Sequence, residues 1–314
     1  MVRTVLFHRK YRRFHGGHLK VWHYFNHVLS APGFDARVLF EIDSSWDSSN
    51  PWSNARDKVI ASLSEVAPEA LFVAGRDWQR LDAIGLLDRG LPILNLIQHT
   101  RHADDWSIQS RYLGRKAIRI CVSEEVAAAV TKAGSQGPIV VIPNSIDVPI
   151  SEMTGGSARP SDLLIAGLKQ PGMAERAREH FSEQGLAVEA FVDHQERDQF
   201  LEAMGRARVT LFLPNEEEGF YLPGLEGMAL GTLVVCPDCV GNRSYCLPGY
   251  NALRPDFVFE ALIEATEAAL ALPATQSNTL LSNATETARA HSPEAERRAF
   301  VGVLGNLDEL WAGD

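Results

Sequence analysis

The fold is decided by residues 208–236, RVTLFLPNEEEGFYLPGLEGMALGTLVVC. The apolar run 208–214 is typical of a buried strand, and 232–237 has the same character. Between them EEEGFYLP forms a loop, Pro223 suits the first turn of a helix, and Gly231 ends that helix. A strand, a helix and a second strand in this order predict a βαβ unit and therefore a parallel sheet.

The same alternation extends in both directions from this stretch. Further strand-like runs are 2–7, 36–42, 69–75, 91–97, 117–122, 138–142, 162–168 and 186–192. Residues 18–30, 54–67, 123–134, 171–184 and 195–206 have helical periodicity, whereas 42–54 is polar and favours a long loop. The pattern predicts an α/β protein of two Rossmann-like, doubly wound domains that face each other across a cleft.

The chain of 314 residues is long enough for two domains. A Gly-, Pro- and Ser-rich break near 148–161 places the boundary, giving an N-terminal domain 1–150 and a C-terminal domain 151–314. The tail from about residue 257 has helical periodicity, and its last helices are expected to pack back on the N-terminal domain. Ligands are expected where the carboxyl ends of the strands meet.

Charge is distributed unevenly along the chain. The net charge of −10 divides into +3 for residues 1–150 and −13 for residues 151–314, while residues 1–34 hold six basic residues, five histidines and no acid. Such a segment would attract phosphates or an anionic membrane surface, although a merely solvated basic face is equally consistent with it. Because neither domain is basic throughout, nucleic acid is not expected as a partner.

Composition also bears on compartment and cofactors. Four cysteines, no signal-peptide pattern and no apolar run of membrane-spanning length favour a cytoplasmic protein, with peripheral contact at the inner face of the membrane as an option. Cys236, Cys239 and Cys246 begin like a zinc motif but lack a nearby histidine, which favours free thiols. No D-x-D, G-x-G-x-x-G or P-loop pattern occurs, so neither a metal nor a cofactor is expected.

Two glutamates lie on either side of the predicted loop-to-helix junction. Glu218 precedes the helix and Glu226 lies in its first turn, with seven residues between them. Free N–H groups and the positive end of the helix dipole suit a diphosphate, and the carboxylates can accept hydrogen bonds from hydroxyls on its two sides. A sugar, a diphosphate and a ribose have this order. Alternatively, Glu226 merely stabilises the helix dipole.

Four motifs resemble one family. The run EGFYLPGLEGMALGTLVV resembles the E-x7-E segment of GT4-type retaining glycosyltransferases (glycosyltransferase group 1), which have the GT-B fold. IPNSIDV at 142–148, RICVSE at 119–124 and Gly16-Gly17 resemble further motifs of that family, in the same order. This resemblance implies a hexosyltransferase of polysaccharide biosynthesis that uses a nucleotide diphosphosugar.

The resemblance assigns roles by position. Glu218 would contact hydroxyls of the transferred sugar, Glu226 the ribose, and His99 the sugar ring, although His99 could equally be a structural cap. The remaining implied donor contacts are backbone groups of Gly16, Gly17, Gly219, Phe220, Tyr221 and Leu222. One departure concerns the phosphate clamp, because Leu168 stands where the family has an arginine. Lys169 would then clamp the phosphate, assisted by Arg176 or the N-terminal basic cluster.

These observations predict a metal-independent, retaining glycosyltransferase with a saccharide or lipid-linked acceptor. The N-terminal domain would be the acceptor side, and its predicted loops contain the polar and aromatic residues Trp46, Asn50, Pro51, Trp52, Asp77 and Trp78. Tryptophans stack on sugar faces, so these residues could bind a saccharide acceptor. Alternatively, they are ordinary loop anchors. The alternatives are a catalytically silent sugar-nucleotide-binding subunit and another enzyme on the same scaffold, such as a sugar-nucleotide epimerase or a phosphorylase.

Overall fold

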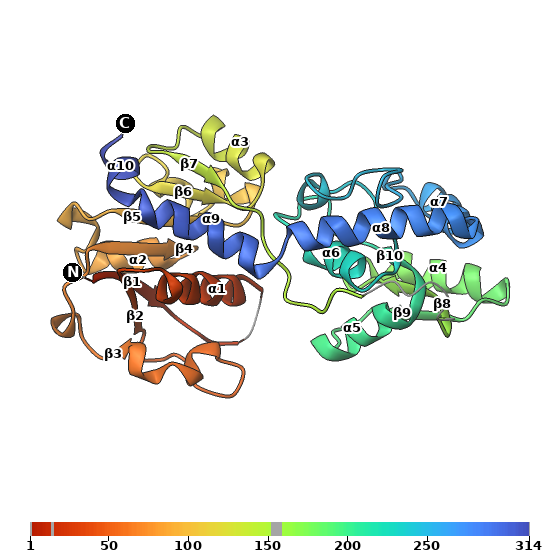
Figure 1. Ribbon diagram of the computed structural model, residues 1–314, viewed down its shortest axis with the longest axis horizontal. Helices are drawn as coiled ribbons and strands as arrows, with labels where there is room; N and C mark the ends of the chain where they lie inside the picture. Colours follow the sequence, from red (N-terminus) through yellow and green to blue (C-terminus); the bar gives the residue numbers. More distant parts are fainter. Residues whose placement is uncertain (1, 14–15, 152–158, 314) are drawn as a thin grey trace. The chain divides into compact units, whose positions relative to one another are not determined.

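The computed structural model describes residues 2–13, 16–151 and 159–313, and it divides into two compact units (Figure 1). Unit 1 comprises residues 1–144 and 294–314, and unit 2 comprises residues 145–293. The observed boundary precedes the predicted one at 150 because residues 145–151 are tied to unit 2. The Ile146 N–H donates to the His291 carbonyl (3.0 Å), and the Ser151 N–H donates to the Ala229 carbonyl (2.7 Å).

Unit 1 contains a seven-stranded parallel sheet of order β3-β2-β1-β4-β5-β6-β7. Its strands are β1 (Arg3–Arg9), β2 (Phe34–Phe40), β3 (Val59–Ile60), β4 (Ala70–Ala74), β5 (Ile93–Ile97), β6 (Ile118–Cys121) and β7 (Ile139–Val141). Every residue of β4, β5 and β6 is buried, which explains why these segments are continuous apolar runs. The order reverses between β1 and β4, so the loops that follow these strands diverge at a switch point.

The helices of unit 1 are α1 (Gly16–Ser30), α2 (Asp77–Ala83), α3 (Glu124–Lys132), α9 (Pro293–Gly305) and α10 (Leu307–Ala312). The Ser123 side chain caps α3 by accepting a hydrogen bond from the Val126 N–H, as Ser before an apolar helical pattern predicts. The last two helices therefore belong to unit 1, although they follow unit 2 in the chain.

A buried charged cluster joins α1 to α9. Lys20 forms an ion pair with Glu296, and the side chains are 2% and 1% exposed. The His27 Nε2 lies 3.1 Å from the second carboxylate oxygen of Glu296. Burial lowers the pKa of Lys20, and the carboxylate of Glu296 opposes that shift. Phe300 of α9 adds an edge-on contact with Tyr24.

One helix predicted in unit 1 is wrong. Residues 54–67 form two 3₁₀ turns on either side of the short edge strand β3. Val59 and Ile60 pair with β2, and their branched side chains suit a strand. The second turn is closed by reciprocal hydrogen bonds of Ser62 and Glu65. Pairing with β2 and local turn capping therefore override the helical spacing of the apolar residues.

Unit 2 contains a four-stranded parallel sheet of order β11-β10-β8-β9. Its strands are β8 (Ser161–Ala166), β9 (Val188–Phe191), β10 (Ala207–Phe212) and β11 (Leu233–Val235). Its helices are α4 (Pro171–Glu183), α5 (Arg197–Arg206), α6 (Leu222–Ala229), α7 (Phe259–Ala271) and α8 (Ala274–Ala290). Alternate residues of β8 enter two cores: Leu164 packs with α5 and α6, and Leu163 with α4 and α7.

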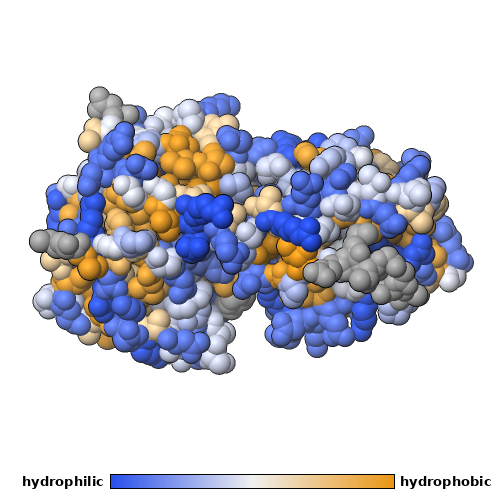
Figure 2. Space-filling model, viewed as in Figure 1, coloured by the Kyte–Doolittle hydropathy of each residue, from blue (hydrophilic) through white to orange (hydrophobic). Residues whose placement is uncertain are grey.

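Both units are thus doubly wound α/β units, and the predicted fold class is confirmed. That they face each other across a cleft stays a prediction. Within the ranges described above, no helix combines the length and apolar character needed to cross a membrane. Figure 2 shows hydrophobic residues as separate patches among hydrophilic ones on the face it presents.

Candidate functional site

The loop between β10 and α6 leaves the carboxyl edge of the unit 2 sheet. α6 begins at Leu222, with Pro223 in its first turn, and Gly231 (φ 72°) follows its end in the left-handed conformation that favours glycine. Glu226 is the fifth residue of α6, so it lies one position beyond the first turn in which the sequence placed it. The predicted strand, loop, helix and strand are confirmed here.

Three neighbouring strands of unit 2 are each followed by a charged residue at the same edge of the sheet, and two of these residues were predicted to bind the donor. β9, β8 and β10 are adjacent and parallel, with Ala166 paired to both Phe191 and Phe212 at their carboxyl ends. Lys169 follows β8, Arg197 follows β9 and Glu218 follows β10. Because parallel strands end at the same edge, these three side chains come from segments that follow neighbouring strands of one sheet.

Glu226 is a buried carboxylate with a cationic partner. It is 3% exposed, and its Oε1 lies 2.7 Å from Nη1 of Arg197, the first residue of α5. The Arg197 side chain is 41% exposed. A carboxylate buried among the apolar residues of α6 carries a desolvation cost that an ion pair only partly offsets. Arg197 could not be predicted from the sequence, because no local pattern links it to Glu226.

Glu218 has a different environment. It is half-buried in the loop, and its Oε1 accepts hydrogen bonds from the backbone N–H (3.3 Å) and the Nδ2 (3.2 Å) of Asn215. These bonds form a local turn that orients the carboxylate without burying it. Glu218 is therefore less buried than Glu226, and a local turn holds its carboxylate in place.

The backbone beside Glu218 is held tightly. The Tyr221 N–H donates to the Gly241 carbonyl (2.9 Å), and the Leu222 N–H donates to the Phe220 carbonyl (3.1 Å), so two of the backbone amides predicted to bind the donor are engaged within the protein. A Cβ at Gly241 would lie 2.8 Å from the Tyr221 nitrogen, which explains why a glycine stands there. The Tyr245 hydroxyl donates to the Tyr221 carbonyl.

The predicted phosphate-binding cations differ in their positions. Lys169 is exposed in the turn between β8 and α4, next to Leu168, which is 49% exposed. The guanidinium of Arg176 lies over the ring of Phe259, 3.8 Å from its centroid. Arg176 is therefore engaged in packing α4 against α7, and Lys169 is the predicted cation that remains exposed at the edge.

Gly16 and Gly17 are the first two residues of α1 rather than part of the predicted loop. A buried network holds this end of the helix: the Arg9 Nη1 lies 2.6 Å from Asp77 Oδ2, and its Nη2 lies 2.7 Å from His18 Nδ1. Burial raises the pKa of Asp77, and the guanidinium of Arg9 opposes this shift. Nothing in the local sequence indicated that Arg9 is buried.

His99 caps a short turn through one ring nitrogen, and its predicted contact with the sugar ring stays a prediction. His99 follows β5, and its Nδ1 accepts the Arg101 N–H (3.1 Å) at the start of a 3₁₀ turn, Thr100–Ala103. That bond places the proton of the neutral ring on Nε2, which makes Nε2–H a hydrogen-bond donor. Burial lowers the pKa of the neighbouring His102 to about 4, so its ring is neutral at pH 7.

The predicted aromatic acceptor residues are mostly internal. Trp52 and Trp78 are 0% and 1% exposed, and Trp46 lies beneath the guanidinium of Arg56, 3.5 Å from its ring centroid. These tryptophans anchor loops, as their alternative interpretation allowed. Trp106, in the loop after His99, is 73% exposed, and the sequence analysis missed it.

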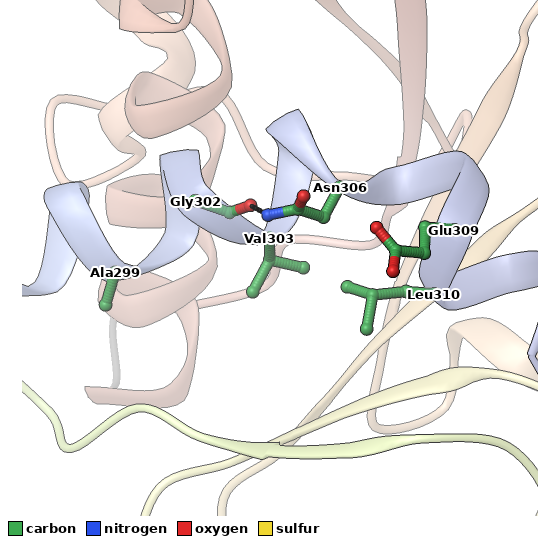
Figure 3. A pocket seen from close by; sticks show the side chains of 6 residues that line it. All are labelled: Ala299, Gly302, Val303, Asn306, Glu309 and Leu310. Atoms are coloured by element: carbon green, nitrogen blue, oxygen red, sulfur yellow. Dashed lines mark hydrogen bonds between the residues drawn. The ribbon is translucent and has the colours of Figure 1, made fainter.

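Two other features take no part in this edge. All four cysteines are buried thiols, and no three His, Cys, Asp or Glu side chains gather as a metal site in the described part of the chain. A hollow on unit 1 lies along α9 and α10, where the Asn306 Nδ2 donates to the Gly302 carbonyl (2.9 Å; Figure 3). Ala299, Val303, Glu309 and Leu310 complete its lining, which contains no predicted site residue.

Comparisons with known proteins show the fold. No protein-family model and no curated protein matches the sequence. Among solved structures, the chain is similar to Anabaena HepE in complex with UDP and glucose, with 15% identity, 97% and 100% of the two chains covered, and a TM-score of 0.72. Sucrose-phosphate synthase from Thermosynechococcus elongatus is 14% identical, with 98% and 99% covered and a TM-score of 0.70.

A third similar structure is the lipopolysaccharide outer core galactosyltransferase WaaB in its apo form. It is 13% identical, with 98% and 99% of the two chains covered and a TM-score of 0.69. The alignments span nearly the whole of each chain. The chain therefore has the GT-B fold that the motifs implied.

Proposed function

We propose that this protein is a glycosyltransferase that moves a sugar from a UDP-sugar to a saccharide or lipid-linked acceptor. The observation that carries the proposal is the pair of glutamates in unit 2, with Glu218 before α6 and Glu226 buried within it. The fold is shared with HepE in complex with UDP-glucose, which supports UDP as the first nucleotide to test.

In this proposal each group acts on a different part of the donor. Glu218 binds hydroxyls of the transferred sugar, and Glu226 binds the ribose. The N-terminus of α6, the Phe220 N–H and the Lys169 ammonium stabilise the charge that develops on the departing diphosphate. Gly16, Gly17 and Gly219 allow the backbone to approach the donor. His99, with its proton on Nε2, donates to the sugar ring.

The stereochemistry and the metal requirement are part of the proposal. We propose retention by attack on the same face of the sugar, as the family resemblance implies, because no sequence motif offers a convincing nucleophile for the opposite face. We also propose that protein cations take the role that a metal ion has in other transferases. An assay with EDTA and an anomeric assignment of the product by NMR test these two points.

The donor is tested by binding. UDP at 100 times its Kd is expected to stabilise the protein by about 2.7 kcal/mol, with or without EDTA, because a ligand that binds only the folded state shifts unfolding by mass action. Differential scanning fluorimetry with UDP, GDP and ADP measures which nucleotide the protein prefers. Glu226→Gln is expected to reduce the stabilisation by UDP, because Glu226 is proposed to bind the ribose. No shift with any nucleoside diphosphate would overturn the proposal.

Binding of UDP-sugars without transfer to any acceptor would instead support the silent subunit, and epimerised product would support an epimerase.

Trp106 is proposed as an acceptor platform. Its ring is 73% exposed, and its loop is fixed by hydrogen bonds, including that from the Ser107 N–H to the Asp104 carbonyl (2.8 Å). A rigid exposed indole offers a stacking face at low entropic cost. Trp106→Ala is expected to weaken binding about threefold to tenfold to those glycans that the wild type captures on an array. Ile84→Ala, at another exposed apolar residue of unit 1, is the control, and equal signals for Trp106→Ala would reject this role.

Membrane contact and a cytoplasmic location stay predictions. Five of the six basic side chains in residues 3–20 have carboxylate partners within the chain, which reduces the free positive charge of that segment. The pairs are Arg3 with Asp308, Arg9 with Asp77, Lys10 with Glu41 and Asp43, Arg12 with Asp43, and Lys20 with Glu296.

A further inference from the structure

We infer that Arg197 is a donor-binding residue that links the buried carboxylate of Glu226 to a phosphate of the nucleotide sugar. This inference rests on the proposed function and assigns to its donor site a cation that the sequence did not reveal. It draws only on residues of unit 2.

The first support is the position of the guanidinium. Its Nη1 lies 2.7 Å from Glu226 Oε1, while the side chain as a whole is 41% exposed. A guanidinium has five N–H groups in a planar fork, so one side can hold a carboxylate while the other meets a second anion. In a nucleotide the ribose and the phosphates are adjacent. A cation that touches the proposed ribose-binding carboxylate is therefore within reach of the phosphates.

The second support is that Arg197 is poorly placed for helix stability. It is the first residue of α5, where the positive end of the helix dipole disfavours a cation. Its partner is also costly, because Glu226 is buried among apolar side chains of α6. The unfavourable position of Arg197 and the burial of Glu226 are both explained if the pair binds the donor at the edge formed by β9, β8 and β10. The guanidinium would then bind an anion and the carboxylate a hydroxyl.

The third support comes from the other arginines of unit 2, most of which are engaged elsewhere. Arg159 donates to carbonyls of Met204, Gly205, Ala207 and Leu230, Arg176 covers Phe259, and Arg178, Arg206, Arg208, Arg243 and Arg254 pair with carboxylates other than Glu226. Arg197 is thus the arginine found on the carboxylate proposed to bind the donor.

The test separates a phosphate contact from mere support of Glu226. Calorimetric titrations with UDP, UMP and uridine are compared for the wild type, Arg197→Gln and Arg197→Lys. Arg197→Gln is expected to weaken UDP binding about 10-fold to 100-fold, in line with loss of a charge-assisted hydrogen bond, and to leave uridine binding unchanged. Arg197→Lys, which keeps the charge, is expected to recover part of the affinity for UDP.

Two controls protect the result. Arg178→Gln removes a similarly exposed arginine from an ion pair on α4 and is expected to bind UDP as the wild type does. The double variant Arg197→Gln/Glu226→Gln removes the buried carboxylate that the single variant leaves unpaired. The double variant is compared with Glu226→Gln alone, because both lack the proposed ribose contact. If the unpaired carboxylate alone caused the loss in Arg197→Gln, the double variant would bind UDP as tightly as Glu226→Gln does, and the phosphate contact would be rejected.

The outcomes are distinct. Equal losses of UDP and uridine binding in Arg197→Gln would overturn the inference, because they would show that Arg197 only positions Glu226. Unchanged UDP binding in Arg197→Gln would also overturn it and would leave the proposed function intact. Absence of nucleotide binding by the wild type would overturn the proposed function itself, and the inference with it.

Discussion

Replacing Glu218 with glutamine is expected to lower kcat/KM for sugar transfer about 10²-fold to 10³-fold, the range for loss of one group that stabilises a transition state. In the proposed function this carboxylate binds hydroxyls of the sugar while positive charge develops on the ring, and an amide is a weaker, neutral acceptor. UDP affinity is expected to change little, because the nucleotide is bound by other groups. UDP release from UDP-glucose in the presence of acceptor measures the first effect, and calorimetry measures the second.

Two neighbouring carboxylates provide a matched control. Glu216 and Glu217 are exposed residues of the same loop. Glu217→Gln makes the same chemical change one position away and is expected to keep wild-type activity. Because Glu218 is only half-buried and its carboxylate accepts hydrogen bonds from Asn215 of the same loop, which a glutamine oxygen can also accept, the melting temperature of Glu218→Gln is expected to match that of the wild type. Wild-type turnover by Glu218→Gln would remove Glu218 from the site.

Replacing Glu296 with alanine is expected to lower the free energy of unfolding by about 3–5 kcal/mol, the cost of leaving a buried charge without its partner. The Lys20 side chain is 2% exposed, and its ammonium would lose the carboxylate that offsets its burial. Since domains have only about 5–15 kcal/mol of stability, the loss is a large fraction of the total. Urea unfolding followed by far-UV circular dichroism measures it. Hydrogen exchange of α9 identifies unit 1 as the part affected.

Glu294→Ala, at an exposed position of α9, is the control and is expected to cost less than 1 kcal/mol, about the size of a helix-dipole effect. The double variant Lys20→Met/Glu296→Leu replaces the ion pair by apolar side chains and is expected to recover most of the lost stability. A Glu296→Ala protein as stable as the wild type would contradict this account of the cluster.

The fold was predicted correctly where each residue's own conformational preference or hydrophobicity determines the local structure. Residues 208–236 combine an apolar run, a proline, a glycine and a second apolar run, and each has a conformational preference that the structure keeps. Residues 54–67 show the limit of this reasoning. Their apolar spacing suits a helix, but pairing of Val59 and Ile60 with a strand far away in the sequence decides their conformation.

The site was predicted where a motif is contiguous and missed where it depends on distant residues. Glu218 and Glu226 belong to one segment, whereas Arg197 reaches Glu226 from another helix. Lys20 and Glu296 are 276 positions apart, and no local pattern connects them. The exposure of a tryptophan is likewise a tertiary property: Trp52 and Trp106 both lie in polar loops, but only tertiary packing decides that one is internal and the other exposed.

The placement of α9 and α10 in unit 1 has a consequence for synthesis on the ribosome. Unit 2 is a contiguous insertion, and its two ends are joined by the hydrogen bond between Ile146 and His291. Its residues are translated before α9 and leave the exit tunnel ahead of it, so unit 2 can be complete outside the tunnel first. Unit 1 begins first but lacks Glu296 and Phe300 until α9 has left the exit tunnel. The order of completion is therefore the reverse of the order in which the two units begin.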